Sequence, residues 1–206
     1  MLVISGTMMT VRLVNGVFRQ LLPAILLATL LAPALAIGED MNESVLLLDF
    51  EDETNRKWEI VNDGVMGGRS KGFVEIQSGR LRFHGELVTQ GGGFTSVRTS
   101  RSLDLSSYDG LEMRVRGNGR RFEVEVNDDH RYGWRSVSRR APFETSDEWQ
   151  TVRVPFSALR ATVFGRSVDV PTVKLAEIQR IGFYILDGKD GPFELEVDSI
   201  RVYRSG

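Results

Sequence analysis

The amino-acid sequence predicts an all-β protein built as an antiparallel β-sandwich or jelly roll. Apolar and polar residues alternate from Leu111 to Arg116 and from Phe122 to Asn127, which is the period of a strand with one buried and one solvent-facing side. Turn residues separate such segments, as Gly117-Asn118-Gly119 does here. The segment Ile181 to Leu186 is apolar on both sides, which indicates a central, covered strand. Many short strands with little sign of helix favour two stacked sheets.

The same alternation recurs along the chain, and around ten strands account for it. The two segments that flank the Gly117 turn are predicted to pair as an antiparallel hairpin. In that hairpin Arg114 and Arg116 would face Glu123 and Glu125 across the strands. In chain order, the expected strands are Val45 to Phe50, Trp58 to Val61, Phe73 to Gln77, Leu81 to Phe83, Phe94 to Thr99, Leu111 to Arg116, Phe122 to Asn127, Val152 to Val154, Ile181 to Leu186 and Phe193 to Val202.

The first 36 residues have the layout of a secretory signal peptide. They contain Arg12 and Arg19 but no acidic residue, then an apolar run from Leu21 to Leu31, and they end in Ala34-Leu35-Ala36. The run is shorter than a membrane span of ~20 residues, so we expect cleavage rather than an uncleaved anchor helix. It also lacks the amphipathic, Arg- and Ser-rich character of a mitochondrial transit peptide. We therefore expect an exported protein, periplasmic or secreted and not membrane-anchored after cleavage, with one β-sandwich domain over residues 37–206.

Composition excludes several classes of function. The chain carries 26 basic and 28 acidic residues, so overall attraction to nucleic acid is not expected. It has no cysteine, which rules out a disulfide framework, a zinc–thiolate site and a thiol nucleophile. Its only histidines, His84 and His130, lie in no metal-binding spacing, and His84 is expected to face solvent. The segment Asp187 to Gly191 has the wrong spacing for an EF-hand and reads as a hairpin turn. We expect neither a metal nor a cofactor.

The most informative segment is the signature loop, which we define as Asn62 to Ser70. It places three glycines, a carboxylate and a carboxamide directly after a strand-like segment. Glycine adopts positive φ without steric cost and lets another chain approach the backbone closely. The loop therefore predicts either a tight corner, with Met66 filling the end of the core, or a surface where a partner docks.

The signature loop belongs to an ordered series of motifs. The series is Trp58, Asn62 to Ser70, Phe83-His84-Gly85, Gly92-Gly93-Phe94, Tyr108-Asp109-Gly110, Arg116-Gly117-Asn118-Gly119, Trp149, Val154-Pro155-Phe156, Ile181-Gly182-Phe183 and Gly191-Pro192-Phe193. It resembles the complex I intermediate-associated protein 30 family, whose domain opens with a Trp and then an N-D-x-x-M-G-G-x-S signature. The resemblance covers about residues 46 to 203. It implies a galactose-binding-like β-sandwich, an assembly-factor or chaperone role in building respiratory complex I, and no catalytic residues.

Aromatic and basic residues add a second part to the candidate binding surface. Between Arg114 and Arg140 lie eight arginines and four acidic residues, together with Tyr132 and Trp134. Arginines beside exposed rings can hold an anionic partner or stack on a sugar, whereas the alternative is a solvated charged loop with Trp134 in the core. The predicted partner- or ligand-binding residues are Trp58, Asn62, Asp63, Met66, Gly67, Gly68, Ser70, Gly92, Gly93, Phe94, Tyr132 and Trp134.

These observations predict a non-enzymatic binding domain that acts as an assembly factor. Its partner would be a protein, such as subunits of a membrane complex. The first alternative is a lectin-like, glycan-binding module, because a jelly roll hosts both kinds of protein. The second is a glycoside hydrolase that uses Glu123 and Glu125, which share one face of a strand at roughly 7 Å. Nearby arginines argue against that chemistry, since a general acid needs a raised pKa.

Overall fold

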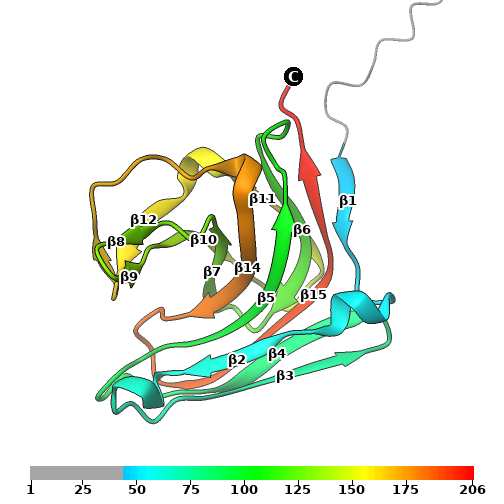
Figure 1. The fold of residues 1–206 in the computed structure, drawn as a ribbon. Coiled ribbons are helices and arrows are strands. Elements are labelled where there is room, and N and C mark those ends of the chain that lie inside the picture. Colours follow the sequence, from blue (N-terminus) through cyan, green and yellow to red (C-terminus); the bar gives the residue numbers. More distant parts are fainter. Residues whose placement is uncertain (1–43) are drawn as a thin grey trace, which may run out of the picture. The chain divides into compact units, whose positions relative to one another are not determined.

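The computed structural model describes residues 44–206, and nearly all of their regular structure is antiparallel β-sheet (Figure 1). The prediction of an antiparallel β-sandwich is therefore confirmed. The predicted signal peptide, residues 1–36, lies outside the described residues. Within residues 44–206, no helix has the length and apolar character that crossing a membrane requires.

Two sheets form the body of the domain, and we name them sheet A and sheet B. Sheet A has the order β11-β6-β15-β4-β3, with β1 also paired to β15. The long strand β15 is the red arrow that leads to the C-terminus and lies between β1 and β6 (Figure 1). The strands of sheet A are β1 (Ser44–Leu48), β3 (Lys71–Gln77), β4 (Arg80–Leu87), β6 (Gly110–Gly117), β11 (Gln150–Pro155) and β15 (Gly191–Tyr203).

Sheet B has the order β13-β12-β10-β7-β14-β5-β2. Its strands are β2 (Glu59–Asn62), β5 (Thr95–Leu103), β7 (Arg121–Asn127), β10 (Ser138–Glu144), β12 (Arg160–Val163), β13 (Arg166–Ser167) and β14 (Ile178–Ile185). The short strands β8 (Arg131–Tyr132) and β9 (Arg135–Ser136) pair with each other, and the 3-10 turns are η1 (Glu53–Arg56), η2 (Asp63–Met66), η3 (Phe156–Ala158) and η4 (Leu175–Glu177).

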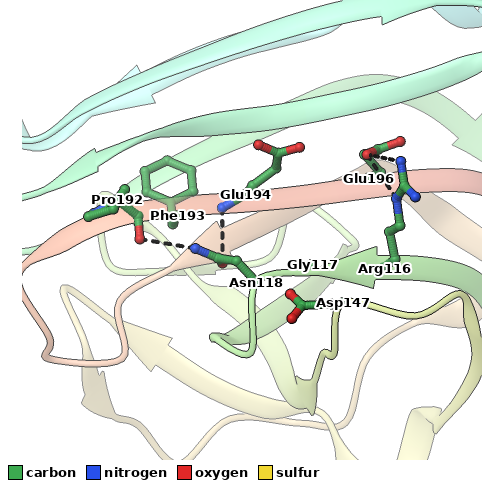
Figure 2. A pocket seen from close by; sticks show the side chains of 8 residues that line it. All are labelled: Arg116, Gly117, Asn118, Asp147, Pro192, Phe193, Glu194 and Glu196. Carbon is green, nitrogen blue, oxygen red and sulfur yellow. Dashed lines mark hydrogen bonds and ion pairs between the residues drawn. The ribbon is translucent and has the colours of Figure 1, made fainter.

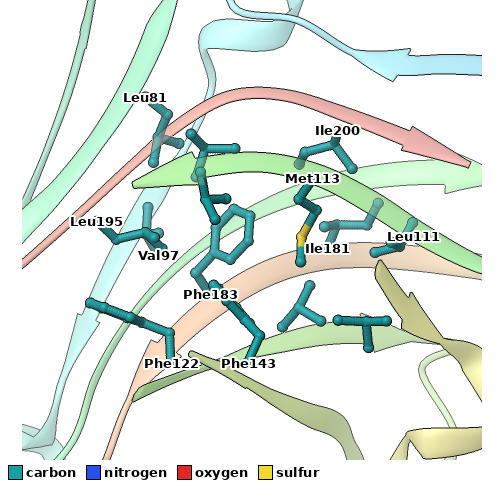
Figure 3. Close-up of a cluster of buried hydrophobic side chains, with 14 of the residues drawn as sticks. Leu81, Val97, Leu111, Met113, Phe122, Phe143, Ile181, Phe183, Leu195 and Ile200 are labelled. Atoms are coloured by element: carbon teal, nitrogen blue, oxygen red, sulfur yellow. The ribbon is translucent and has the colours of Figure 1, made fainter. Parts of the chain in front are cut away.

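Side chains from both sheets meet in one apolar core (Figure 3). Phe83 of β4 contacts Phe193 of β15 within sheet A, with ring centroids 4.9 Å apart. The same Phe83 reaches Phe122 of β7 in sheet B, at 6.4 Å. The alternation seen in the sequence explains this arrangement, because every second residue of each strand points into the space between the sheets. Burial of these rings is the main stabilising contribution to the fold.

The predicted hairpin between Leu111–Arg116 and Phe122–Asn127 is wrong. The first segment is β6 in sheet A and the second is β7 in sheet B, so the Gly117 turn crosses from one sheet to the other. Arg116 consequently pairs with Glu196 of β15 at 2.7 Å rather than with an acid of β7. Alternation determines which side of a strand is buried, but it carries no information on which strand lies beside it. Two strands show the same alternation in the sequence whether they pair in one sheet or lie in two sheets that face each other.

The predicted central strand is confirmed. Ile181 to Leu186 falls in and just after β14, which pairs with β5 on one side and β7 on the other. The turn expected before Phe193 is also a crossover rather than a hairpin, because β14 and β15 lie in different sheets. The buried pair between Arg120 and Asp187, at 2.6 Å, holds this crossover against the one that precedes β7.

Replacement of Phe183 should test the core directly. Its fully buried ring stacks on Trp58 at 6.0 Å and contacts Phe143 at 6.2 Å. We expect Phe183→Ala to lower the free energy of unfolding by about 3–5 kcal/mol, because it removes the ring and leaves a cavity. Urea denaturation measures the change. The matched control, Phe73→Ala on the exposed face of β3, should cost about 1 kcal/mol or less. Equal losses in the two variants would contradict this account of the core.

Candidate functional site

The signature loop is organised around one buried carboxylate, that of Asp63. Asp63 begins η2, and its side chain is fully buried. Its oxygens accept hydrogen bonds from the Ser70 backbone at 2.9 Å, from the Ser70 hydroxyl at 2.6 Å and from the Gly93 backbone at 2.7 Å. A buried carboxylate needs such donors, because its desolvation is otherwise costly. Asp63 therefore holds the signature loop and the Gly92-Gly93-Phe94 segment together.

The glycines around Asp63 are required by close approach. A Cβ on Gly68 would lie 2.1 Å from the Asp63 carboxyl carbon, and one on Gly92 would lie 2.4 Å from a carboxyl oxygen. Gly67 ends the η2 turn in the left-handed region, at φ 86°. The alternative of a tight corner, which the sequence left open, thus has a concrete geometry.

Asn62 performs a related task between the two sheets. Its side-chain oxygen accepts from the Gly72 backbone of β3 at 2.9 Å and from the Thr95 hydroxyl of β5 at 2.5 Å. Strand β3 belongs to sheet A and strand β5 to sheet B. Asn62 and Asp63 together fasten the two sheets at this edge of the sandwich.

The hydrogen bonds also set the charge state of Asp63. Burial raises the pKa of this carboxyl, but the donors Ser70, Gly93 and Phe94 outweigh burial and hold the pKa below its ordinary 3.8. Asp63 is therefore ionised at neutral pH, where its charge is shared among backbone amides.

The other predicted binding residues lie in three places. Trp58 is in the core, where its indole nitrogen donates to the Asn55 carbonyl at 2.8 Å. Met66 has an exposed fraction of 52%, so the alternative in which it fills the core is wrong. Trp134, at 74%, is likewise not in the core, and it lies with the exposed Tyr132 at the β8–β9 hairpin. These predicted binding residues are thus divided between the core, the signature loop and the β8–β9 hairpin.

The outer face of sheet B carries a groove with a volume of about 750 Å³. Met66 and the segment Gly92 to Phe94 line one end of it, so part of the predicted binding set borders this groove. Phe164 and Ser136 line it near β12 and β9. The side chains along its floor come from β5, β7, β10, β12 and β14, and they are Arg98, Glu125, Asn127, Ser138, Arg140, Thr162, Arg180 and Tyr184.

Glu125 is the centre of the groove floor. Only 1% of its surface is exposed, and its carboxylate pairs with Arg180 at 3.2 Å. It also accepts hydrogen bonds from Ser138 at 2.6 Å and from Tyr184 at 3.3 Å. Burial, followed by the neighbouring Glu125 charge, raises the pKa of Tyr184, so its hydroxyl stays protonated as a donor. This network fixes the side chains in the positions they occupy.

Arginine guanidinium groups cover the aromatic ring in the floor. Those of Arg98 and Arg140 lie over the Tyr184 ring at 4.9 and 4.6 Å from its centroid. Arg140 also pairs with Glu123 at 3.1 Å. The two carboxylates that could have served a hydrolase are thus paired with Arg140 and Arg180, and not with the arginines of β6 that the sequence suggested.

Near β9 and β12 the rim of the groove is aromatic and basic. Phe164, with 67% of its surface exposed, lies in a tight turn at φ 48°, a conformation that a bulky side chain rarely adopts. The Arg135 guanidinium lies 5.1 Å from the Phe164 ring centroid and 4.8 Å from that of Trp134. The chain exposes two large rings here at a cost in stability.

Sequence reasoning missed the groove floor except for Glu125, which it named as a possible hydrolase carboxylate. Most of the floor residues occupy the solvent-facing side of a strand, where alternation predicts only that a residue is polar, and Tyr184 lies in the segment that was predicted to be apolar on both sides. The eight arginines between Arg114 and Arg140 were the available signal: Arg140 lines the groove, and Arg135 stacks on Phe164, which also lines it. The pairing of strands from distant parts of the chain was needed to bring these groups together.

A smaller hollow lies on sheet A (Figure 2). Asn118 spans it, donating to the Pro192 carbonyl at 3.3 Å and accepting from the Glu194 backbone at 3.1 Å. The charged residues that line this hollow are Asp147, Glu194 and the ion pair of Arg116 with Glu196 (Figure 2). Among the described residues, no three His, Asp or Glu side chains gather in a way that would hold a metal ion.

The family of the chain follows from comparison with known proteins. The family model of complex I intermediate-associated protein 30 matches residues 48–197, which include the signature loop and the groove floor. The chain belongs to the complex I intermediate-associated protein 30 family. The mouse protein of that name is 31% identical over 182 residues, covering 74% of this chain and 54% of the relative. The Drosophila melanogaster protein is 26% identical over 186 residues, covering 78% of this chain and 63% of the relative. The chain thus spans a little over half the length of these relatives.

Two solved structures share the fold at lower identity. A family 11 carbohydrate-binding module of a Clostridium thermocellum cellulase is 18% identical, with a TM-score of 0.57 over 79% of this chain and 95% of that one. The same module in complex with a β-1,3-1,4-mixed-linked tetrasaccharide gives 0.56 at 18% identity, over 79% and 96% of the two chains. These likenesses concern the β-sandwich alone.

The predicted location is wrong. We expected a periplasmic or secreted protein from the apolar segment near the N-terminus. The mouse and Drosophila relatives are named as mitochondrial proteins, and so is a Caenorhabditis elegans relative, 33% identical, whose name is probable complex I intermediate-associated protein 30, mitochondrial. These family relatives overturn the prediction of export.

We expect Asp63→Asn to lower the free energy of unfolding by about 2–4 kcal/mol near neutral pH, because an amide nitrogen would face buried donors. The folded-state pKa of Asp63 lies below its ordinary 3.8. The ionised carboxylate therefore contributes its full stabilisation above about pH 3.8, the ordinary pKa that applies in the unfolded chain. This stabilisation is lost as the pH falls from there through the lower pKa of the folded state. The difference between wild type and variant should shrink over that range.

Urea denaturation at a series of pH values measures this difference. The exposed Asp169→Asn serves as the matched control and should change stability little. A stable Asp63→Asn variant that has lost a binding partner would instead assign Asp63 to a binding surface.

Proposed function

We propose that this chain is a non-enzymatic binding domain that serves as an assembly factor, and that it docks a protein partner in the groove of sheet B. Membership of the complex I intermediate-associated protein 30 family supports the assembly role. The partners would be subunits of the membrane complex from which the family takes its name. The geometric support for the proposal is the groove, because it is the larger of the two hollows described above.

The floor of the groove is suited to binding. The network around Glu125 holds Arg180, Ser138 and Tyr184 in fixed positions, so little side-chain entropy is lost when a partner binds. The exposed rings of Phe164 and Trp134 extend the surface beyond the groove. Large exposed rings and arginines are the residues that supply most binding energy in protein interfaces.

The arrangement of charged groups disfavours hydrolysis. A glycoside hydrolase needs one carboxyl that donates a proton and a second that acts as nucleophile or base. Here Glu123 pairs with Arg140, and Glu125 accepts from several side chains at once. These contacts support the proposal of a non-enzymatic domain.

A glycan is the second candidate ligand, favoured by the exposed Trp134 and Phe164 rings beside a polar floor. The ring of Tyr184 argues against it, because arginine guanidinium groups cover the face on which a sugar would stack. A protein segment can use the guanidinium groups themselves, through their hydrogen-bond donors.

The variant Ser136→Trp tests the proposal by filling the groove. Ser136 is exposed, lines the groove and makes no side-chain hydrogen bond among the described residues. We expect tagged full chain, cross-linked in its native cells, to capture complex I subunits, and Ser136→Trp to reduce that capture at least about tenfold by steric exclusion. Quantitative mass spectrometry of the captured proteins is the measurement. Ser157→Trp, at a site that is also exposed but lies outside the groove, should capture as wild type does.

Two results would contradict the proposal. If Ser136→Trp and Ser157→Trp capture complex I subunits equally, the groove is not the surface that binds them. Binding of glycans with no complex I subunit captured would favour the second candidate, and cleavage of such a glycan would overturn the non-enzymatic assignment.

A further inference from the structure

The charges of the groove floor do not balance. Arg180 is neutralised by Glu125 at 3.2 Å, and Arg140 by Glu123 at 3.1 Å. Arg98 has no carboxylate within 4.0 Å among residues 44–206. Arg98 is half-buried, and Glu59, which lies opposite it on β2, makes no close ion pair with it. A half-buried guanidinium without a close carboxylate is a position where an anionic ligand would be stabilised.

Arg98 is held in place while its outer nitrogens remain available. Its Nε donates to the Ser96 hydroxyl at 3.1 Å, and its guanidinium lies over the Tyr184 ring. No described residue accepts a hydrogen bond from its two terminal nitrogens. A guanidinium anchored through Nε and stacked on a ring presents those nitrogens as a fork, the geometry that binds a carboxylate through two parallel hydrogen bonds.

The backbone beneath Arg98 gives it room. Arg98 of β5 lies opposite Gly182 of β14, and Glu125 of β7 lies on the other side of the same glycine. A Cβ on Gly182 would come within 3.0 Å of the Arg98 Cγ and within 2.8 Å of the Val97 carbonyl. The glycine therefore lets the Arg98 side chain lie across the centre of the sheet.

We infer that the groove recognises an extended acidic segment of a protein partner, and that Arg98 is the residue that binds its carboxylate. This inference rests on the proposed function and names the chemistry of the partner. Further positive charge lies nearby, because Arg160 of β12 lies opposite Arg140 and Arg135 stacks on Phe164, and neither has an acidic partner within 4.0 Å among the described residues. The rim rings of Phe164 and Trp134 give apolar neighbours of the acidic residues a surface to contact.

A peptide fits these features better than a neutral sugar does. The backbone groups of β5, β7 and β14 are used in the sheet, where β14 pairs on both sides, so recognition falls to side chains. The side chain without a close acidic partner is that of Arg98, a cation, and a neutral sugar cannot neutralise its charge. A carboxylate in the groove would be screened less by salt than one on an open surface, so a single pair there contributes appreciably to affinity.

The test uses full chain and a fluorescein-labelled (Glu-Ser)4 peptide, with binding followed by fluorescence anisotropy at low ionic strength. We expect Arg98→Gln to bind the peptide roughly tenfold to a hundredfold more weakly than wild type, the range for a hydrogen bond to a charged group. Arg98→Lys should fall between the two, because it keeps the charge and loses the fork. Arg121→Gln removes the same charge at an exposed position of sheet B outside the groove, and it should bind as wild type does. A (Gln-Ser)4 peptide should not bind.

Three results would overturn the inference. One is equal weakening in Arg98→Gln and Arg121→Gln, which would mean general charge attraction. The second is no binding of (Glu-Ser)4 to wild type. The third is displacement of the peptide by the mixed-linked tetrasaccharide, which would make the groove a sugar site. Urea denaturation checks that Arg98→Gln is folded, and if it is not, Ser136→Trp must abolish peptide binding in its place.

The experiment separates this inference from the proposed function. If the acidic peptide fails to bind while Ser136→Trp still loses complex I subunits, the assembly role stands and the acidic chemistry is wrong. If the peptide binds through Arg98 but no complex I subunit is captured, the acidic site stands and the assembly role is wrong.

Discussion

The sandwich depends on the polar joint that Asn62 and Asp63 make between its two sheets. Asn62 accepts hydrogen bonds from β3 in sheet A and from β5 in sheet B, and Asp63 accepts from Ser70 and from Gly93. Apolar packing drives the sheets together but is not directional. These directional bonds fix the position of sheet A relative to sheet B at this edge. They also bring the segment before β5 to the end of the groove.

A second polar joint fixes the two crossovers between the sheets. Arg120 lies in the crossover from β6 to β7, and Asp187 lies in the crossover that follows β14. Arg120 forms an ion pair with Asp187 and donates a hydrogen bond to the Pro192 carbonyl at 2.9 Å. One guanidinium therefore connects the two crossovers. Burial raises the pKa of Asp187, but the hydrogen bonds from Arg120 and the Lys189 backbone, together with the charge of Arg120, outweigh burial and lower the pKa, so the pair remains charged. With these connections held, the strands of sheet B keep one register and the groove one shape.

The sequence predicted what is local and missed what is distant. The buried side of each strand followed from alternation, as Phe122 and Phe183 illustrate, and the loop around Asp63 was recognised from its glycines. The partner of Asp63, Gly93, is thirty residues away, and no local pattern connects them. Glu112 and Arg153 on sheet A alternate in the same way as the groove residues, yet they form an exposed pair and no groove. Only strand order distinguishes the two faces.

The groove floor is better explained by binding than by stability. Burying Glu125 with Arg180 costs desolvation energy that apolar side chains of similar size would not incur, and replacing such pairs is often neutral or stabilising. An outer face needs no such network to keep the sandwich folded, because the core lies on the other side of sheet B. What the network does provide is a set of fixed hydrogen-bond donors, because burial and then the Glu125 charge raise the pKa of Tyr184, and the Arg98 guanidinium stacks on the Tyr184 ring. A partner that binds such donors does not have to order them, and the energy spent in folding is recovered as affinity.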